Sequence, residues 1–427
     1  MGYAGETRPF QHNPNFLYSI QFNLLNVYLS WKLSINGRIH AMSILPACYP
    51  TAITNLRMRA LAFAAFSIVY LTSGYALLHV WWSAEYALRW LVIAAGLTVY
   101  LQVILWRNLE ANHRAGETQL LTAFGIGNSL TLLRGLFIAA MAGFLLSPIP
   151  PGRLVWLPGI LYTLACAADF MDGYLARLTN HSTHLGEILD LGFDGLGVLT
   201  AVLLAVQYGQ VPVWYLLVAL ARYLFLAGQW ALGRLGRPVY DLPPRPSRRV
   251  FAGLQMGFLA VALYPVFSAP ALHLAAAFFG LPLLAGFLRD WLYVSGVLRA
   301  DWRLSQALHH RIHHDLPLLL RGLVLAFGLS LFVKGGEPVA LLGFFLAAVS
   351  LGVLLGISGR LLSILGLILL GHQQTFVSLS VPQVLLGAAF VAILYLGSGR
   401  YSLWKPEEHL FHRRAGEKRQ FEAERTG

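Results

Sequence analysis

The sequence predicts an all-α protein whose helices cross a membrane several times. Of its 427 residues, 57% are hydrophobic and only 12% are charged, and the mean hydropathy is +0.61. Soluble globular proteins carry about 25% charged residues. Several apolar runs approach the roughly 20 residues that a helix needs to cross the hydrocarbon core. A helix also satisfies its backbone hydrogen bonds within one segment, as a membrane requires.

The charge pattern agrees with this class. The formal net charge is +12, and the basic residues gather in loops such as residues 233–249. The positive-inside rule accounts for such loops, whereas no motif of a nucleic-acid reader is present. We therefore expect no nucleic-acid partner. Cys48 and Cys166 lie far apart in the sequence and indicate neither a disulfide framework nor a zinc site.

The first 56 residues form an N-terminal extension. Its apolar stretch from Phe16 to Trp31 is either an interfacial helix or part of a region upstream of a native start at Met42. No basic region precedes an apolar run here, so we expect no cleaved signal peptide. A two-helix membrane segment (57–112) follows, with spans near 60–82 and 87–106.

A short helix on the membrane face is expected from Glu117 to Asn128, and six further spans follow it. They are the apolar run to Leu146, a helix from about residue 154, and helices near 185–206, 213–232, 250–266 and 271–296.

A linker (299–315), which contains the run HHRIHH, leads to a C-terminal membrane segment (316–400) and a charged tail (401–427). Four spans are expected in this segment, near 316–333, 338–356, 360–371 and 381–398. The third is short enough to be re-entrant. Alternation of the resulting twelve spans places both termini and the basic loops in the cytoplasm.

Four aspartates in one stretch carry the chemistry. Asp169 and Asp172 are three residues apart on one helix, and Asp190 and Asp194 are four apart on the next. Each pair shares a helix face, and a short connection makes the two helices antiparallel neighbours. Carboxylates so close need a compensating charge, which Mg²⁺ or Mn²⁺ would provide, as two ions in a phosphoryl-transfer site. The alternatives are a proton or ion relay within the membrane and simple capping of two helix ends.

Small residues and one arginine accompany the aspartates. Gly173 and Ala176 leave room for a ligand against the helix, and Gly186 allows a close approach of the second helix or of a phosphate. Arg177 adds a planar, permanently charged phosphate binder. His181 and His184 in the connecting loop are expected to border the ligand.

The stretch reads D-x2-D-G-x2-A-R-x8-G-x3-D-x3-D, and it resembles the signature of the CDP-alcohol phosphotransferase (CDP-alcohol phosphatidyltransferase) family. Upstream, N-x2-T-x2-R resembles the motif that opens the family's first core helix. The resemblance covers residues 113–298 and implies a six-helix catalytic core. This chain adds two N-terminal and about four C-terminal spanning helices. It departs from many members at Leu191, where they have proline, and at Gly195, where they have lysine.

The resemblance implies a role for each signature residue. The four aspartates would bind one or two Mg²⁺ or Mn²⁺ ions, and Asp194 would also take the proton from the acceptor hydroxyl. The cytidine diphosphate group would be held by Asn128, Thr131, Gly173, Ala176, Arg177 and Gly186.

Four arginines are candidates for binding the acceptor: Arg134, Arg222, Arg248 and Arg249. Arg222 lies inside a span, where its charge is costly unless it faces the bundle. It either lines the acceptor pocket or forms a structural salt bridge. Arg248 and Arg249 either bind an anionic acceptor, together with Gln255, or reach headgroups as anchors.

The predicted function is a membrane phospholipid synthase. It would transfer a phosphatidyl group from CDP-diacylglycerol to a small, polar and plausibly phosphorylated alcohol, with release of CMP. The alternatives are transfer from CDP-choline or CDP-ethanolamine to diacylglycerol, a polytopic transporter, and an inactive scaffold. We expect a homodimer in a bacterial or archaeal cell membrane, with its active site facing the cytoplasm. The segment GSGRYSLW (397–404) resembles the closing motif of DoxX-like membrane proteins.

Overall fold

The computed structural model describes residues 49–114, 116–240, 242, 246–298, 315–334, 340–374, 380–399 and 401–404. Within these ranges the chain forms twelve α-helices and no β-strand, which confirms the predicted all-α class. The helices are α3 (Tyr49–Trp81), α4 (Ala84–Arg107), α5 (Gly125–Ala142), α6 (Leu157–Leu178), α7 (His184–Gln207), α8 (Leu216–Arg234), α9 (Pro246–Ala262), α10 (Ala269–Val294), α12 (Leu316–Lys334), α13 (Ala340–Leu355), α14 (Gly359–Gln373) and α15 (Val381–Leu396).

Eight of the described helices are long and apolar enough to cross a membrane. The other four, α9, α13, α14 and α15, are apolar but shorter, at 15 to 17 residues. Most helices also expose large apolar side chains on their outer faces, where they would contact the apolar chains of membrane lipids. The protein is therefore a multi-pass membrane protein.

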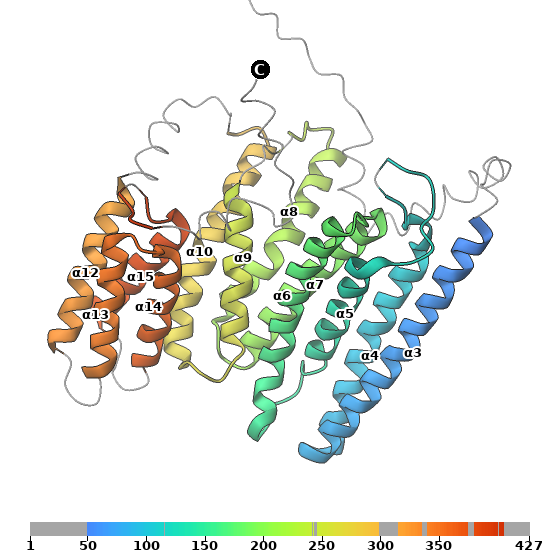
Figure 1. Ribbon diagram of the computed structural model, residues 1–427, viewed down its shortest axis with the longest axis horizontal. Coiled ribbons are helices and arrows are strands. Elements are labelled where there is room, and N and C mark those ends of the chain that lie inside the picture. Colours follow the sequence, from blue (N-terminus) through green and yellow to red (C-terminus); the bar gives the residue numbers. More distant parts are fainter. Residues whose placement is uncertain are drawn as a thin grey trace, which may run out of the picture.

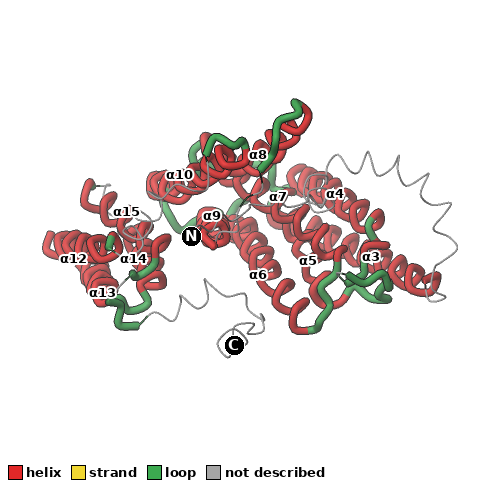
Figure 2. The backbone as a smooth tube through the Cα atoms, turned by 90° about the horizontal axis from the view of Figure 1, so that it is seen from above, coloured by secondary structure: helices red, strands yellow, loops and turns green. Residues whose placement is uncertain are grey.

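The helices stand side by side in one elongated array (Figure 1). Seen from above, α3 and α4 lie at one end and the bundle of α12 to α15 lies at the other (Figure 2). The C-terminal bundle has a hydrophobic core of its own, which includes Leu346 and Phe390. It joins the rest through α10 and α15, where Tyr395 packs near Phe279.

Helix α5 is the centre of the part that carries the aspartates. It packs against α4, α6 and α7, and two thirds of its span are buried, compared with 17% for α3. Small residues permit this close packing. A Cβ at Gly127 would lie 2.8 Å from the Cβ of Ala176 and 3.1 Å from the carbonyl oxygen of Asp172, both on α6. A larger side chain at Gly127 would therefore push α6 away from α5.

The short helix expected from Glu117 to Asn128 is wrong in its first part. Residues 116–124 form a loop, and α5 begins only at Gly125. The side chain of Asn112 donates hydrogen bonds to the carbonyl groups of Leu121 and Ala123, at 3.1 and 2.9 Å. These bonds satisfy backbone groups that a helix would otherwise pair, so the loop is stable without helical bonds.

Three sequence expectations lie outside the described residues. They are the interfacial helix from Phe16 to Trp31, the HHRIHH run at 309–314, and the tail beyond residue 404.

One buried arginine holds the end of the C-terminal bundle together through hydrogen bonds. The side chain of Arg321 on α12 is 1% exposed. It donates to the carbonyl groups of Ser398 and Tyr401 and to the hydroxyl of Ser402. The backbone amide of Gly359, at the start of α14, donates to the hydroxyl of Ser398 at 3.1 Å. Segment 397–404, singled out in the sequence, thus ties α12, α14 and α15 together.

We expect Gly366→Ala to destabilise this bundle by about 1–3 kcal/mol, the usual cost of overpacking a core. Its Cβ would lie 2.4 Å from the ring of Phe390, a side chain that is fully buried. Gly257→Ala on α9 is the control, because its Cβ would meet no atom within 4 Å. That change should be neutral or stabilising by up to about 1 kcal/mol. Thermal unfolding in detergent measures both, and equal midpoints would contradict the packing described for α14 and α15.

Candidate active site

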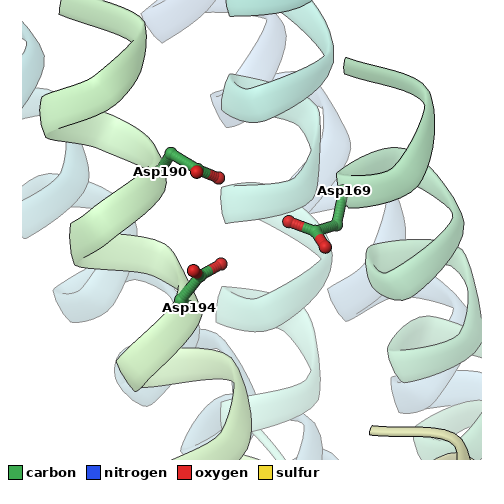
Figure 3. Close-up of side chains that lie close together, drawn as sticks. All are labelled: Asp169, Asp190 and Asp194. Carbon is green, nitrogen blue, oxygen red and sulfur yellow. The ribbon is translucent and has the colours of Figure 1, made fainter. Parts of the chain in front are cut away.

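Three aspartates from two helices converge at one place. Asp169 comes from α6, and Asp190 and Asp194 come from α7. Each offers a carboxylate oxygen within 4.8 Å of the others, and Figure 3 shows the three side chains turned toward the same space. The i, i+4 spacing puts Asp190 and Asp194 on one face of α7, and that face looks toward α6. We call these three residues the carboxylate cluster.

The guanidinium group of Arg134 lies within the carboxylate cluster. Arg134 comes from α5 and its side chain is 3% exposed. It forms an ion pair with Asp169, and its Nη atoms lie 2.7 Å from Asp190 Oδ1 and 3.3 Å from Asp194 Oδ1. The ring of Phe193 lies 5.9 Å from the guanidinium carbon. A permanent positive charge at this point stabilises three carboxylates that would otherwise repel one another.

Asp172 has a different environment from the other three aspartates. It is 7% exposed, and the hydroxyl of Thr131 donates a hydrogen bond of 2.8 Å to its Oδ2 atom. Asp172 does not belong to the group of carboxylates whose oxygens lie within 4.8 Å of one another. Its hydrogen bond with Thr131 instead joins α6 to α5. The spacing in the sequence predicts one site made of four equivalent aspartates. In the structure, Asp169, Asp190 and Asp194 form the cluster and Asp172 lies apart from it.

Asn128 holds the start of α7 against α5. Its side-chain amide donates to the hydroxyl of Thr183 at 2.8 Å and to Asn112 Oδ1 at 3.2 Å. Thr183 is the N-cap of α7 and accepts a hydrogen bond from the amide of Gly186. A Cβ at Gly186 would lie 2.5 Å from Asn128 Oδ1. Only glycine therefore allows this contact between α5 and α7.

Asn128, Thr131 and Arg134 contact three different parts of the site from one helix. They are spaced by three residues and share a face of α5. They contact in turn the start of α7, Asp172 and the carboxylate cluster. The motif is visible in the sequence, but the role of Arg134 in neutralising the cluster is visible only in the structure. Its spacing from Asn128 was the available signal, since it puts a cation on the same face as the other two polar residues.

The remaining signature residues lie on the last turns of α6. Ala176 packs against Gly127, as described above. A Cβ at Gly173 would lie 3.2 Å from an Nη atom of Arg177. The absence of a side chain at Gly173 thus leaves room for the Arg177 guanidinium group.

The other candidate arginines lie at different distances from the cluster. Arg222 on α8 donates to the carbonyl group of Leu191 at 3.1 Å, one residue after Asp190. Arg248 instead pairs with Asp290 on α10, at 2.7 Å. The side chain of Arg249 lies outside the described part. Of these three arginines, Arg222 is thus the acceptor candidate that the fold brings to α7.

Gly195, where many members of the resembled family have lysine, has a packing reason in this chain. A Cβ at this position would lie 2.7 Å from the hydroxyl of Tyr223 on α8. The lysine side chain would need the space that Tyr223 occupies. Arg222, the neighbour of Tyr223, places a cation near the same turn of α7.

The donor set suits a hard divalent cation. The three carboxylates of the cluster supply oxygen ligands, which Mg²⁺ and Mn²⁺ prefer, and no sulfur or imidazole donor belongs to the group. The Arg134 ion pairs show that the cluster requires positive charge. The residues present therefore fit a divalent metal ion.

Comparison with known proteins agrees with this geometry. The model of the CDP-alcohol phosphatidyltransferase family matches residues 124–298. A CDP-diacylglycerol–glycerol-3-phosphate 3-phosphatidyltransferase of Pseudomonas fluorescens is 33% identical over 185 residues, which are 42% of this chain and 90% of that protein. A protein of the same name from Bacillus subtilis is 33% identical over 115 residues, 25% of this chain and 60% of that protein.

A choline/ethanolaminephosphotransferase 2 of Arabidopsis thaliana is 41% identical over 76 residues, 16% of this chain and 20% of that protein. No solved structure shows significant similarity to the chain. The chain belongs to the CDP-alcohol phosphatidyltransferase family. It spans about 60% of the length of the Bacillus relative.

We expect Mn²⁺ or Mg²⁺ to stabilise the protein through the carboxylate cluster. A ligand present at about 100 times its dissociation constant stabilises the folded state by about 2.7 kcal/mol. Asp190→Asn should reduce this gain, since it removes a charged ligand. Glu85→Gln is the control, because Glu85 is exposed on α4 and pairs only locally with Arg89. Thermal unfolding with and without the metal measures the effect, and an equal gain in wild type and Asp190→Asn would show that the cluster does not bind the ion.

Proposed function

We propose that the protein is a metal-dependent phospholipid synthase. It transfers the phosphatidyl group of CDP-diacylglycerol to the hydroxyl of a small phosphorylated alcohol and releases CMP. The observation that carries this proposal is the carboxylate cluster with Arg134 at its centre, in a chain of this family. The names of the Pseudomonas and Bacillus relatives support a glycerol phosphate as the acceptor.

The reaction needs a base, a charge-neutralising cation and a held donor. A divalent ion bound by the cluster would neutralise the charge that develops on the phosphoryl oxygens. Asp194 takes the proton from the acceptor hydroxyl. The hydroxyl oxygen then forms a bond to the β-phosphorus of the donor, and the bond from that phosphorus to the CMP oxygen breaks.

We assign the donor's cytidine diphosphate group to the end of α6 and the start of α7, which lie beside the cluster. Arg177 offers a cation on α6 beside Gly173, Ala176 packs α6 against α5, and Gly186 offers backbone at the start of α7. Asn128 and Thr131 hold these elements in place through their bonds to Thr183 and Asp172. Arg177 suits a diphosphate because its planar guanidinium group binds two oxygens at once.

The acceptor's phosphate is assigned to Arg222. Arg134 is already engaged by three carboxylates and Arg248 by Asp290. Arg222 contacts the backbone of α7 next to Asp190, so a phosphate bound there would put a neighbouring hydroxyl near Asp194.

The site end of the helices is assigned to the cytoplasm. The loop after α8 carries Arg234 and Arg237 at this end of α8. The turns at the opposite ends, 147–152 and 207–212, contain no charged residue. The positive-inside rule then favours a cytoplasmic site, where a soluble acceptor meets a membrane-held donor.

CMP release tests the proposal directly. Purified full-length protein in liposomes should release CMP from CDP-diacylglycerol when Mn²⁺ or Mg²⁺ and glycerol 3-phosphate are present. Asp194→Asn should lower kcat by about 10²–10⁴-fold, the usual contribution of a general base, and Glu85→Gln should not. A parallel assay with CDP-choline and diacylglycerol tests the activity that the Arabidopsis relative's name suggests. No release with any acceptor, or an unchanged rate in Asp194→Asn, would contradict the proposal.

Acceptor binding gives a separate prediction. Arg222→Ala should raise KM for glycerol 3-phosphate by roughly tenfold or more, since a hydrogen bond to a charged group contributes about 1.5–3 kcal/mol. KM for CDP-diacylglycerol should change by no more than about twofold, which corresponds to the smallest free energy that one net hydrogen bond contributes. Arg234→Ala on the same helix is the control, because its guanidinium group stacks on Trp230 at the helix end. An unchanged KM for the acceptor would remove Arg222 from the site.

A further inference from the structure

A small cavity lies directly behind the carboxylate cluster, between α5, α6 and α7, and Met256 of α9 also lines it. It offers about 20 Å³ to the centre of a water molecule, and one water needs roughly 10–15 Å³ by this measure. Its polar lining comes from Arg134, Tyr162, Cys166 and Asp194, and the rest is apolar. The space therefore suits one water.

Two of the lining groups are buried without a hydrogen-bond partner among the described residues. The first is the hydroxyl of Tyr162, a side chain that is 2% exposed and whose polar neighbour on α6 is the Cys166 thiol, a weak hydrogen-bonding group. The second is Nε of Arg134, whose Nη atoms contact the carboxylates. A buried polar group without a partner costs about 1–3 kcal/mol, and ordered water commonly satisfies such groups.

We propose that this cavity binds one structural water that joins Tyr162 to Asp194. The donors and acceptors balance. The water oxygen accepts from the Tyr162 hydroxyl and from Arg134 Nε–H, and one water hydrogen is donated to the Asp194 carboxylate. Three bonds are typical of a buried water. They would satisfy both buried groups that otherwise lack partners.

This water makes Tyr162 a positioning residue for Asp194. Arg134 lies 3.3 Å from one oxygen of Asp194, and the water adds a second contact from the side of α6. Asp194 is about 40% exposed, so without such a contact its carboxylate has more freedom to rotate. The consequence for the rate rests on the proposed function, in which Asp194 is the base, whereas the water site does not.

Tyr162→Phe removes the hydroxyl and little else. It should lower kcat by roughly three- to tenfold, the equivalent of one net hydrogen bond, with KM for both substrates unchanged. Tyr208→Phe is the matched control. The Tyr208 hydroxyl is also buried without a partner among the described residues, but it lies about 20 Å from Asp194 along α7, at about 1.5 Å per residue. Its kcat should equal that of wild type.

A structure of the full-length wild-type protein in a nanodisc, at a resolution that shows ordered waters, tests the site without activity. The expected density lies within hydrogen-bond distance of both the Tyr162 hydroxyl and the Asp194 carboxylate. A cavity filled by a side chain, or a direct bond between Tyr162 and Asp194, would overturn the proposal. Equal kcat in Tyr162→Phe and wild type would overturn the positioning role of Tyr162. If wild type releases no CMP, the proposed function fails, and the density still decides the water site.

Discussion

The ion pairs of Arg134 with Asp169, Asp190 and Asp194 are the interaction on which the rest of this structure depends. The Arg134 side chain is 3% exposed, and a buried charge without a partner is costly, so the guanidinium group must lie close to the carboxylates. These ion pairs join α5 to α6 and α7, and α5 is mostly buried between its neighbours. Glycine stands at positions 127 and 186 because α5 and its neighbours lie too close together there for a side chain.

Helix positions could be predicted because a membrane span is a property of the local sequence. Every described helix lies under an apolar run that the sequence shows, although α3 begins at Tyr49, well before the predicted residue 60. The loop at 116–124 could not be predicted. Its stability comes from the Asn112 side chain, whose bonds to Leu121 and Ala123 depend on how the chain returns and leave no periodic trace.

The site was predictable to the level of a helix face. Spacing places Asp190 and Asp194 on one side of α7, and the structure has them facing Asp169. Spacing does not reveal which neighbour a face meets. Asp172 therefore contacts Thr131 rather than the cluster, and Arg134 contacts the carboxylates rather than an open pocket. Tyr162 carried no signal, because a tyrosine in a span is ordinarily a packing residue.

Helices α6 and α7 contact each other much less than either contacts α5. Packing of α6 and α7 against α5 therefore sets the distance between Asp169 on α6 and the two aspartates on α7. Mg²⁺ demands a nearly ideal octahedron with short bonds, whereas larger ions tolerate distortion. Gly135, the residue next to Arg134, packs between Leu101 and Phe193, so residues of α5 that touch no carboxylate also help to set this distance. Repacking this one helix would therefore change the spacing of the carboxylates, and with it the ions that fit the cluster, without any substitution of an aspartate.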